Sequence, residues 1–201
     1  QGICAEIELR AVSAAADGLD TLYLGGGTPS RLGGEGVAQL LDGVRSRLPI
    51  ARGAEVTLEA NPEDVSAQAV AAWRTAGVTR LSMGIQSFDD GVLQWMHRVH
   101  DSDAAVRAVE IAREGGLAAF SVDLIFALPD NVSRDWQRDL DRVLHLDPDH
   151  VSLYGLTIEP HTPLGKWQAR GALLPPSDDR YAEEFLQAHQ QLVAAGYEHY
   201  E

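Results

Sequence analysis

The chain has 201 residues, of which 45% are hydrophobic and 23% are charged, a balance typical of a globular protein with a packed core. Its formal net charge of −14 disfavours nucleic acid and acidic membranes as partners, because phosphates are bound by a surplus of Lys and Arg. The sequence contains no run of about 18 apolar residues, so it predicts no membrane-spanning helix. The single cysteine, Cys4, excludes an internal disulfide and favours a reducing, cytoplasmic compartment.

Helix and strand patterns alternate along the whole chain, beginning with a helix over about 2–16. Runs of apolar and β-branched residues then predict five strands, at 20–26, 55–61, 79–86, 119–129 and 150–157. Apolar side chains at helical spacing, and Ala-rich stretches that end in glycine, predict helices at 37–48, 65–76, 103–114, 136–144 and 181–193. This order predicts an α/β fold with a parallel sheet, and the pattern leaves a (β/α) barrel and a doubly wound sheet both open.

The segment 21–30 carries the clearest functional signal. An apolar strand pattern runs directly into Gly25, Gly26 and Gly27, and Thr28 follows. Three successive glycines remove every side chain from one place, so that a ligand can lie against the peptide groups. At the carboxyl end of a strand in an α/β protein, this pattern favours a small-molecule site. The alternative is a plain turn between a strand and a helix.

Three of the other predicted strands also carry polar residues at or near their carboxyl ends: Glu59 and Asn61, Gln86 and Ser87, and Tyr154 with Thr157. The strand predicted at 119–129 has Asp123 inside an otherwise apolar run. Each has a simpler interpretation, such as a solvated carboxylate for Glu59 or a loop hydrogen bond for Gln86. Asp123 is harder to dismiss, because a carboxylate between apolar neighbours is costly to bury without a partner. Arg98 suits either a ligand carboxylate or a surface ion pair.

A metal site is not predicted. His97 and His100 have the spacing of a ligand pair, but no third ligand lies near them in the sequence. A loop or helix-surface pair is the simpler interpretation of these two histidines.

Six segments together resemble the radical S-adenosylmethionine (SAM) proteins of the oxygen-independent coproporphyrinogen III oxidase group. They are YLGGGTPS (23–30), LEANPED (58–64), RLSMGIQSFDD (80–90), MHRVHD (96–101), VDLIFALPD (122–130) and LDPDHVSLYGLTIEPHTPL (146–164). Their order and spacing match across nearly the whole chain. The segments YGLTIEPHTPL (154–164) and GYEHYE (196–201) are more similar to the heme-chaperone branch of this group than to the oxidase.

The resemblance implies that the first two strands contribute four SAM-binding residues. Gly26, Gly27 and Thr28 match the glycine-rich turn that lines the methionyl end of SAM. Glu59 matches a glutamate that contacts SAM.

Four further positions are implied on the later strands. Gln86, Arg98 and Asp123 match positions that hold SAM in the oxidase, where a second SAM is included. Thr157 matches a backbone contact on the next strand. The resemblance assigns no catalytic residue and no metal ligand to this chain.

The chain departs from the family pattern at the iron–sulfur site. The family holds a [4Fe-4S] cluster on a CxxxCxxC loop after the first of six barrel strands, and this chain contains Cys4 alone. We therefore expect a piece of a longer protein, with the cysteine loop upstream of Gln1 and a heme-holding domain downstream. Residues 1–170 then form a partial (β/α)6 barrel of strands two to six, and 171–201 form a linker, best placed at 171–178, and the start of the C-terminal region.

The resemblance implies a heme chaperone that depends on SAM and a [4Fe-4S] cluster, with heme or porphyrin as ligand and acceptor hemoproteins as candidate partners. Its alternative within the group is the oxidase, in which a 5′-deoxyadenosyl radical starts the decarboxylation of coproporphyrinogen III. A third hypothesis is a cluster-free barrel that binds a nucleotide. Without the cysteine loop, this chain is expected to bind SAM weakly and to reduce nothing.

Overall fold

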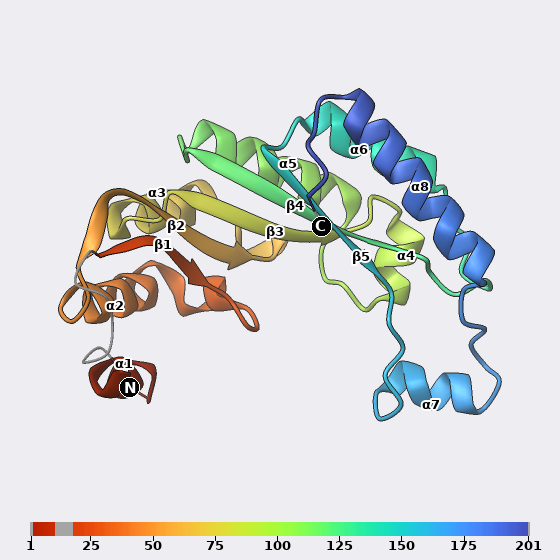
Figure 1. Ribbon diagram of the computed structural model, residues 1–201, viewed down its shortest axis with the longest axis horizontal. Coiled ribbons are helices and arrows are strands. Elements are labelled where there is room, and N and C mark those ends of the chain that lie inside the picture. Colours follow the sequence, from red (N-terminus) through yellow and green to blue (C-terminus); the bar gives the residue numbers. More distant parts are fainter. Residues whose placement is uncertain (1, 11–17, 201) are drawn as a thin grey trace. The chain divides into compact units, whose positions relative to one another are not determined.

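The computed structural model describes residues 2–10 and 18–200. Within them, one sheet holds β1 (Leu19–Leu24), β2 (Ile50–Ala60), β3 (Arg80–Gln86), β4 (Ala119–Phe126) and β5 (His150–Gly155), which Figure 1 labels. The strands run parallel and follow the order β1-β2-β3-β4-β5. A doubly wound sheet reverses its strand order at one point, and this sheet does not. The order is that of a (β/α) barrel, which resolves the alternative left open by the sequence pattern.

All five predicted strands are present, and their ends differ from the prediction for local reasons. β1 ends at Leu24, because the positive φ angles of Gly26 (84°) and Gly27 (133°) turn the chain out of the strand. β4 ends at Phe126 rather than at 129, because Ala127 also has a positive φ, of 54°. β2 begins at Ile50, where it pairs with Leu19 of β1, rather than at 55.

The helices that connect and flank the strands agree with the predicted set and add to it. They are α1 (Gly2–Arg10), α2 (Gly33–Arg45), α3 (Ala67–Ala76), α4 (Asp90–Trp95), α5 (Ser102–Glu114), α6 (Trp136–Leu146), α7 (Pro163–Ala169) and α8 (Asp178–Ala194). The predicted first helix matches α1 over 2–10, and its remainder, 11–16, lies outside the described residues. The short helix α7 was not predicted.

Local capping explains where several helices begin and end. Ser66 accepts a hydrogen bond from the Ala69 N–H at the start of α3, and Gly77, with φ 105°, ends that helix. Asp89 caps α4 by accepting from the N–H groups of Gly91 and Val92. A side-chain oxygen at each of these helix starts thus replaces the missing backbone partners.

The chain divides into two compact units. The first consists of residues up to Gly84 together with 107–121. In its core α2 and α3 pack so closely that a Cβ atom on Gly34 would lie 2.4 Å from the Cβ of Ala72. The largest fully buried side chains of this unit are Val37, Leu41, Leu58, Trp73, Leu81 and Met83.

The second unit consists of 85–106 and 122–201. Its fully buried side chains come from β3, β4 and the segments and helices that follow them: Ile85, Phe88, Leu93, Leu124, Leu128 and Leu140. The predicted linker at 171–178 lies between α7 and α8. None of the helices within 2–10 and 18–200 combines the length and apolar character that crossing a membrane requires.

Candidate functional site

The glycine turn after β1 is open to solvent. Gly26 and Gly27 both have positive φ angles, a region that residues with a Cβ atom adopt at a cost. A Cβ built on either glycine would meet no heavy atom within 4 Å, so space for a ligand lies beside this backbone. Thr28 follows as the N-cap of a short 3-10 helix, Pro29–Leu32, without a side-chain capping bond.

Glu59, near the carboxyl end of β2, is joined to this turn. Its Oε2 accepts the N–H of Gly26 at 3.1 Å, and its Oε1 accepts the hydroxyl of Tyr23 at 2.8 Å. A Cβ on Gly25 would lie 2.8 Å from the same Oε1 and 2.5 Å from Cε1 of Tyr23, so this glycine is needed for space. Gly26 and Glu59, predicted separately from two strands, are therefore brought into contact.

Two residues that the sequence reasoning missed support this turn. Tyr23 is 54% exposed at the end of β1, and its hydroxyl orients Glu59. Ser30 is buried, and its hydroxyl donates to Asp64 Oδ2 at 2.7 Å, which fastens the turn after β1 to the turn after β2. A tyrosine two residues before a triple glycine was the available signal for Tyr23. No local signal pairs Ser30 with Asp64.

The other four predicted residues lie in the second unit. Gln86 ends β3 with a positive φ of 73° and is partly buried. Asp123 is also partly buried, and it alternates along β4 with the buried Val122 and Leu124. Gln86 is thus the last residue of β3, whereas Asp123 lies within β4 among buried neighbours.

Arg98 and Thr157 lie outside regular elements. The partly buried Arg98 follows α4, and its backbone N–H donates to the carbonyl of Leu93 at 2.8 Å. The exposed Thr157 follows β5, and its hydroxyl donates to the carbonyl of Gly155 at 3.5 Å. The Thr157 side chain therefore makes a local contact, and it is the backbone of Thr157 that the family resemblance concerns.

The two histidines of the pair His97 and His100 have different surroundings. His100 is buried with its Nε2 3.1 Å from the carbonyl oxygen of Ile85, whereas His97 is exposed. Within the described ranges, no group of three or more His, Cys, Asp or Glu residues is arranged to hold a metal ion. Iron–sulfur clusters are held mainly by cysteine thiolates, and Cys4 is the one cysteine of the sequence. The residues present therefore do not supply the ligands of a [4Fe-4S] cluster.

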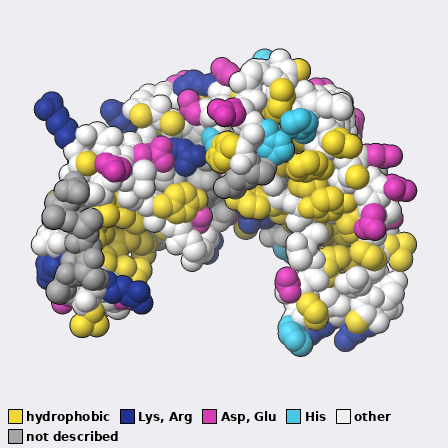
Figure 2. Space-filling model, viewed as in Figure 1, with side chains coloured by type: hydrophobic (Ala, Val, Ile, Leu, Met, Phe, Trp, Pro, Cys, Tyr) yellow, Lys and Arg dark blue, Asp and Glu magenta, His cyan; other side chains and the backbone are white. Residues whose placement is uncertain are grey.

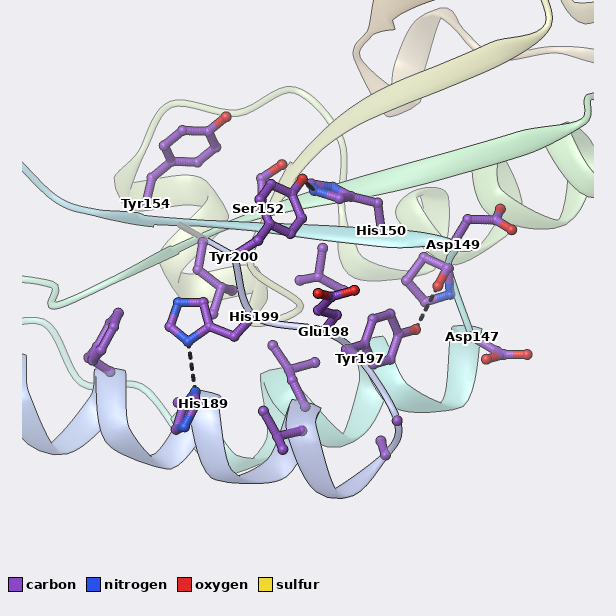
Figure 3. A pocket seen from close by; sticks show the side chains of 18 residues that line it. Asp147, Asp149, His150, Ser152, Tyr154, His189, Tyr197, Glu198, His199 and Tyr200 are labelled. Carbon is purple, nitrogen blue, oxygen red and sulfur yellow. Dashed lines mark hydrogen bonds between the residues drawn. The ribbon is translucent and has the colours of Figure 1, made fainter. Parts of the chain in front are cut away.

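A separate cavity of about 640 Å³ lies between β5, α8 and the segment 195–200 (Figure 3). Figure 2 shows histidine and hydrophobic side chains close together over this part of the second unit. The Nδ1 atoms of His189 and His199 lie 2.7 Å apart, and His150 Nε2 lies 2.5 Å from the Tyr200 hydroxyl. None of the eight predicted site residues lines this cavity.

The charges of this cavity limit what it can bind. The residues that line it include Asp147, Asp149 and Glu198, and no Lys or Arg is among the described lining residues. Burial, with added repulsion from Asp147 and Asp149, raises the pKa of Tyr197, whose hydroxyl donates to the carbonyl of Pro148 at 2.6 Å. The polar groups of the described lining are thus carboxylates, histidines and hydroxyls.

A parallel α/β sheet in sequential order places this chain in the (β/α) barrel class, in which sites for small molecules lie at the carboxyl ends of the strands. The family model of the Radical SAM superfamily matches residues 4–143, and the chain belongs to this superfamily.

Within this superfamily, the chain is similar to heme chaperones. The chain is 45% identical over 181 residues to the heme chaperone HemW of Escherichia coli K12, a match that covers 90% of this chain and 47% of that protein. It is 41% identical over 197 residues to HemW of Mycobacterium tuberculosis CDC 1551, covering 98% of this chain and 50% of that protein. The chain thus spans about half the length of these relatives.

Among solved structures, the chain resembles coproporphyrinogen III oxidase (HemN) from Escherichia coli, a radical SAM enzyme. The TM-score is 0.83 at 27% identity, over 98% of this chain and 45% of that one. This match confirms the predicted fold class, the partial radical SAM barrel.

Proposed function

We propose that this chain is the SAM-binding part of a radical SAM heme chaperone. The observation that carries the proposal is the contact of Glu59 with the glycine turn, in a chain that is 45% identical to HemW over 90% of its length. The oxidase alternative rests on a likeness at 27% identity, so the chaperone is favoured.

Under this proposal, each of the two units carries residues that are suited to contact SAM. In the first, Gly26, Gly27 and Thr28 offer backbone groups beside open space, and Glu59 is oriented to accept hydrogen bonds. A carboxylate that accepts from Tyr23 and Gly26 still has lone pairs for the cationic amino group of a methionyl ligand.

In the second unit, Gln86 and Asp123 offer an amide and a carboxylate, which suit the hydroxyls and base edge of a nucleoside. Arg98 suits a carboxylate, and the backbone of Thr157 adds a polar contact. When bound, SAM and a reduced [4Fe-4S] cluster supply radical chemistry, and the protein positions the cofactor and excludes water. The cluster ligands would come from outside this chain. Heme, acceptor hemoproteins and a cytoplasmic location stay predictions.

The test is to express the full-length protein anaerobically, reconstitute it with iron and sulfide, and measure both SAM binding and heme binding. We expect a broad visible absorbance that dithionite bleaches, SAM binding that Glu59→Gln weakens, and heme binding without decarboxylation of coproporphyrinogen III. Glu63→Gln is the matched control, because it makes the same chemical change at an exposed residue of the turn after β2. It should leave SAM affinity unchanged.

Decarboxylation would favour the oxidase instead. A colourless protein that binds SAM would favour the cluster-free barrel, and a protein that binds no SAM would refute the proposal.

A further inference from the structure

Strained backbone occurs at the carboxyl ends of β3 and β4, which belong to the second unit. Gln86 closes β3 with φ 73°, and Ala127 directly follows β4 with φ 54°. Residues with a Cβ atom persist in this left-handed region only where their surroundings hold them there. Side chains that contact the backbone next to Gln86 and Ala127 must therefore stabilise these two conformations.

Asp139 on α6 holds the chain directly after Gln86. Its Oδ1 accepts the N–H of Phe88 at 2.7 Å, and its Oδ2 accepts the hydroxyl of Ser87 at 2.8 Å. Asp139 is 1% exposed and Ser87 is fully buried, so water does not replace these bonds. A carboxylate with two donors at fixed positions leaves the 87–88 backbone little freedom.

Glu184 on α8 holds the residue after β4 in a similar way, with its Oε2 accepting the N–H of Ala127 at 2.7 Å. Arg134 links both carboxylates. Its Nη2 donates to Glu184 Oε2 at 2.5 Å, and its Nη1 lies 3.8 Å from Asp139 Oδ2. The same Nη1 donates to the carbonyl of Ile125, inside β4, at 2.5 Å.

This network is costly to bury. Burial raises the pKa of Asp139 against the opposing effect of its hydrogen bonds, and burial lowers the pKa of Arg134 against the attraction of Glu184 and Asp139. Nε of Arg134 is buried without a hydrogen-bond partner among the described residues. Apolar side chains of similar volume often stabilise a core as well as a buried ion pair does. Stability alone therefore does not explain these residues.

We propose that Asp139 is a positioning residue for Gln86, and that Arg134 couples it to Glu184 so that the ends of β3 and β4 are held together. Asp139 fixes the two residues after Gln86, and through them the direction of the Gln86 amide. This inference rests on the proposed function, in which Gln86 contacts SAM. Its structural part is separable from that function, because hydrogen exchange reports the held backbone without any ligand.

The test uses Asp139→Asn in the full-length, cluster-loaded protein. Asp141→Asn is the matched control, because Asp141 is an exposed carboxylate on the same helix that accepts a hydrogen bond from Gln137. For Asp139→Asn we expect the Kd for SAM to rise about tenfold, and exchange of the Phe88 amide to speed up by at least about tenfold, with iron content unchanged. Asp141→Asn should change neither.

A double variant separates positioning from direct contact. If Asp139 acts through Gln86, then Gln86→Ala with Asp139→Asn should bind SAM no more weakly than Gln86→Ala alone. Fully additive losses would overturn the proposal, and so would Phe88 exchange that Asp139→Asn leaves unchanged. Should Asp139→Asn fail to fold, Ser87→Ala removes one of the two bonds without touching a charge, and should raise the Kd about threefold.

Failure of this inference and failure of the proposed function look different. SAM affinity that falls in Gln86→Ala but not in Asp139→Asn overturns the positioning role alone. SAM affinity that falls in neither overturns the assignment of Gln86 to SAM, and the positioning role with it.

Discussion

Gly25→Ala tests how the glycine turn and Glu59 fit together. The new Cβ would lie 2.5 Å from Tyr23 Cε1 and 2.8 Å from Glu59 Oε1. Tyr23 is 54% exposed, so its ring can swing away, and steric strain is then a small part of the cost. The main loss is the 2.8 Å hydrogen bond between Tyr23 and Glu59, which in this exposed position contributes about 1 kcal/mol.

Denaturant unfolding of four proteins measures this loss: wild type, Gly25→Ala, Tyr23→Phe and the double variant. We expect Tyr23→Phe to lower the free energy of unfolding by about 1 kcal/mol in the wild type and by nearly zero in the Gly25→Ala background. Equal losses in both backgrounds would refute the reasoning, because the hydroxyl would then act independently of the space that Gly25 leaves.

Gly26→Ala is the matched control for the glycine turn. Its Cβ would meet no atom within 4 Å, and its cost of about 1–2 kcal/mol comes from the positive φ instead. Tyr23→Phe should therefore cost as much in Gly26→Ala as in the wild type, provided that the Glu59 side chain stays in place.

Three further predictions concern stability. The N–H of Ser102 donates to Asp90 at 2.8 Å and lowers the pKa of Asp90 below its usual 3.8. The wild type should therefore be more stable than Asp90→Asn above about pH 4, and this difference should vanish as the pH falls through the folded-state pKa. Unfolding curves in a pH series check this. Ser66→Ala removes the cap of α3 and should cost about 1 kcal/mol in chemical denaturation. Gly34→Ala places two Cβ atoms 2.4 Å apart and should cost about 1–3 kcal/mol by the same measurement, recovered in part by Ala72→Gly.

The sequence predicted the elements well, because the signals for them are local. Apolar runs and helical spacing depend on neighbours within one turn or one strand. The start of β2 could not be found in this way, because 50–54 contains Gly53 with φ 85°, and the register with β1 shifts between the Leu19–Ile50 and Thr21–Glu55 pairs. α7 was missed because it is short, so periodicity hardly registers in it.

The candidate site was predicted in part for the same reason. Gly26 and Glu59 each stand out locally, since both follow or end an apolar strand pattern. The groups that hold the later strand ends do not. Asp139 is 52 residues from Ser87, and Glu184 is 57 residues from Ala127, so no local pattern pairs them. Only the folded chain brings these carboxylates to the strand ends.

β1 and β3 satisfy similar geometry with different residues. After β1, the residues with positive φ are Gly26 and Gly27, which adopt this conformation at little energetic cost and carry no side chain. At the end of β3, the residue with positive φ is Gln86, and a glycine at this position would be less strained. A protein that keeps glutamine there, and holds the next two residues with a buried carboxylate, retains the amide at a cost in stability.

Substitutions at Gln86 should therefore separate stability from SAM binding. Gln86→Gly should unfold at a higher free energy than Gln86→Ala by about 1 kcal/mol, because only glycine relieves the positive φ. Both variants lack the amide, so both should bind SAM equally weakly under the proposed function. Denaturation and SAM titration of the two full-length variants check this. A Gln86→Gly protein less stable than Gln86→Ala would mean that the backbone of Gln86 is not strained, and that the amide needs no functional explanation.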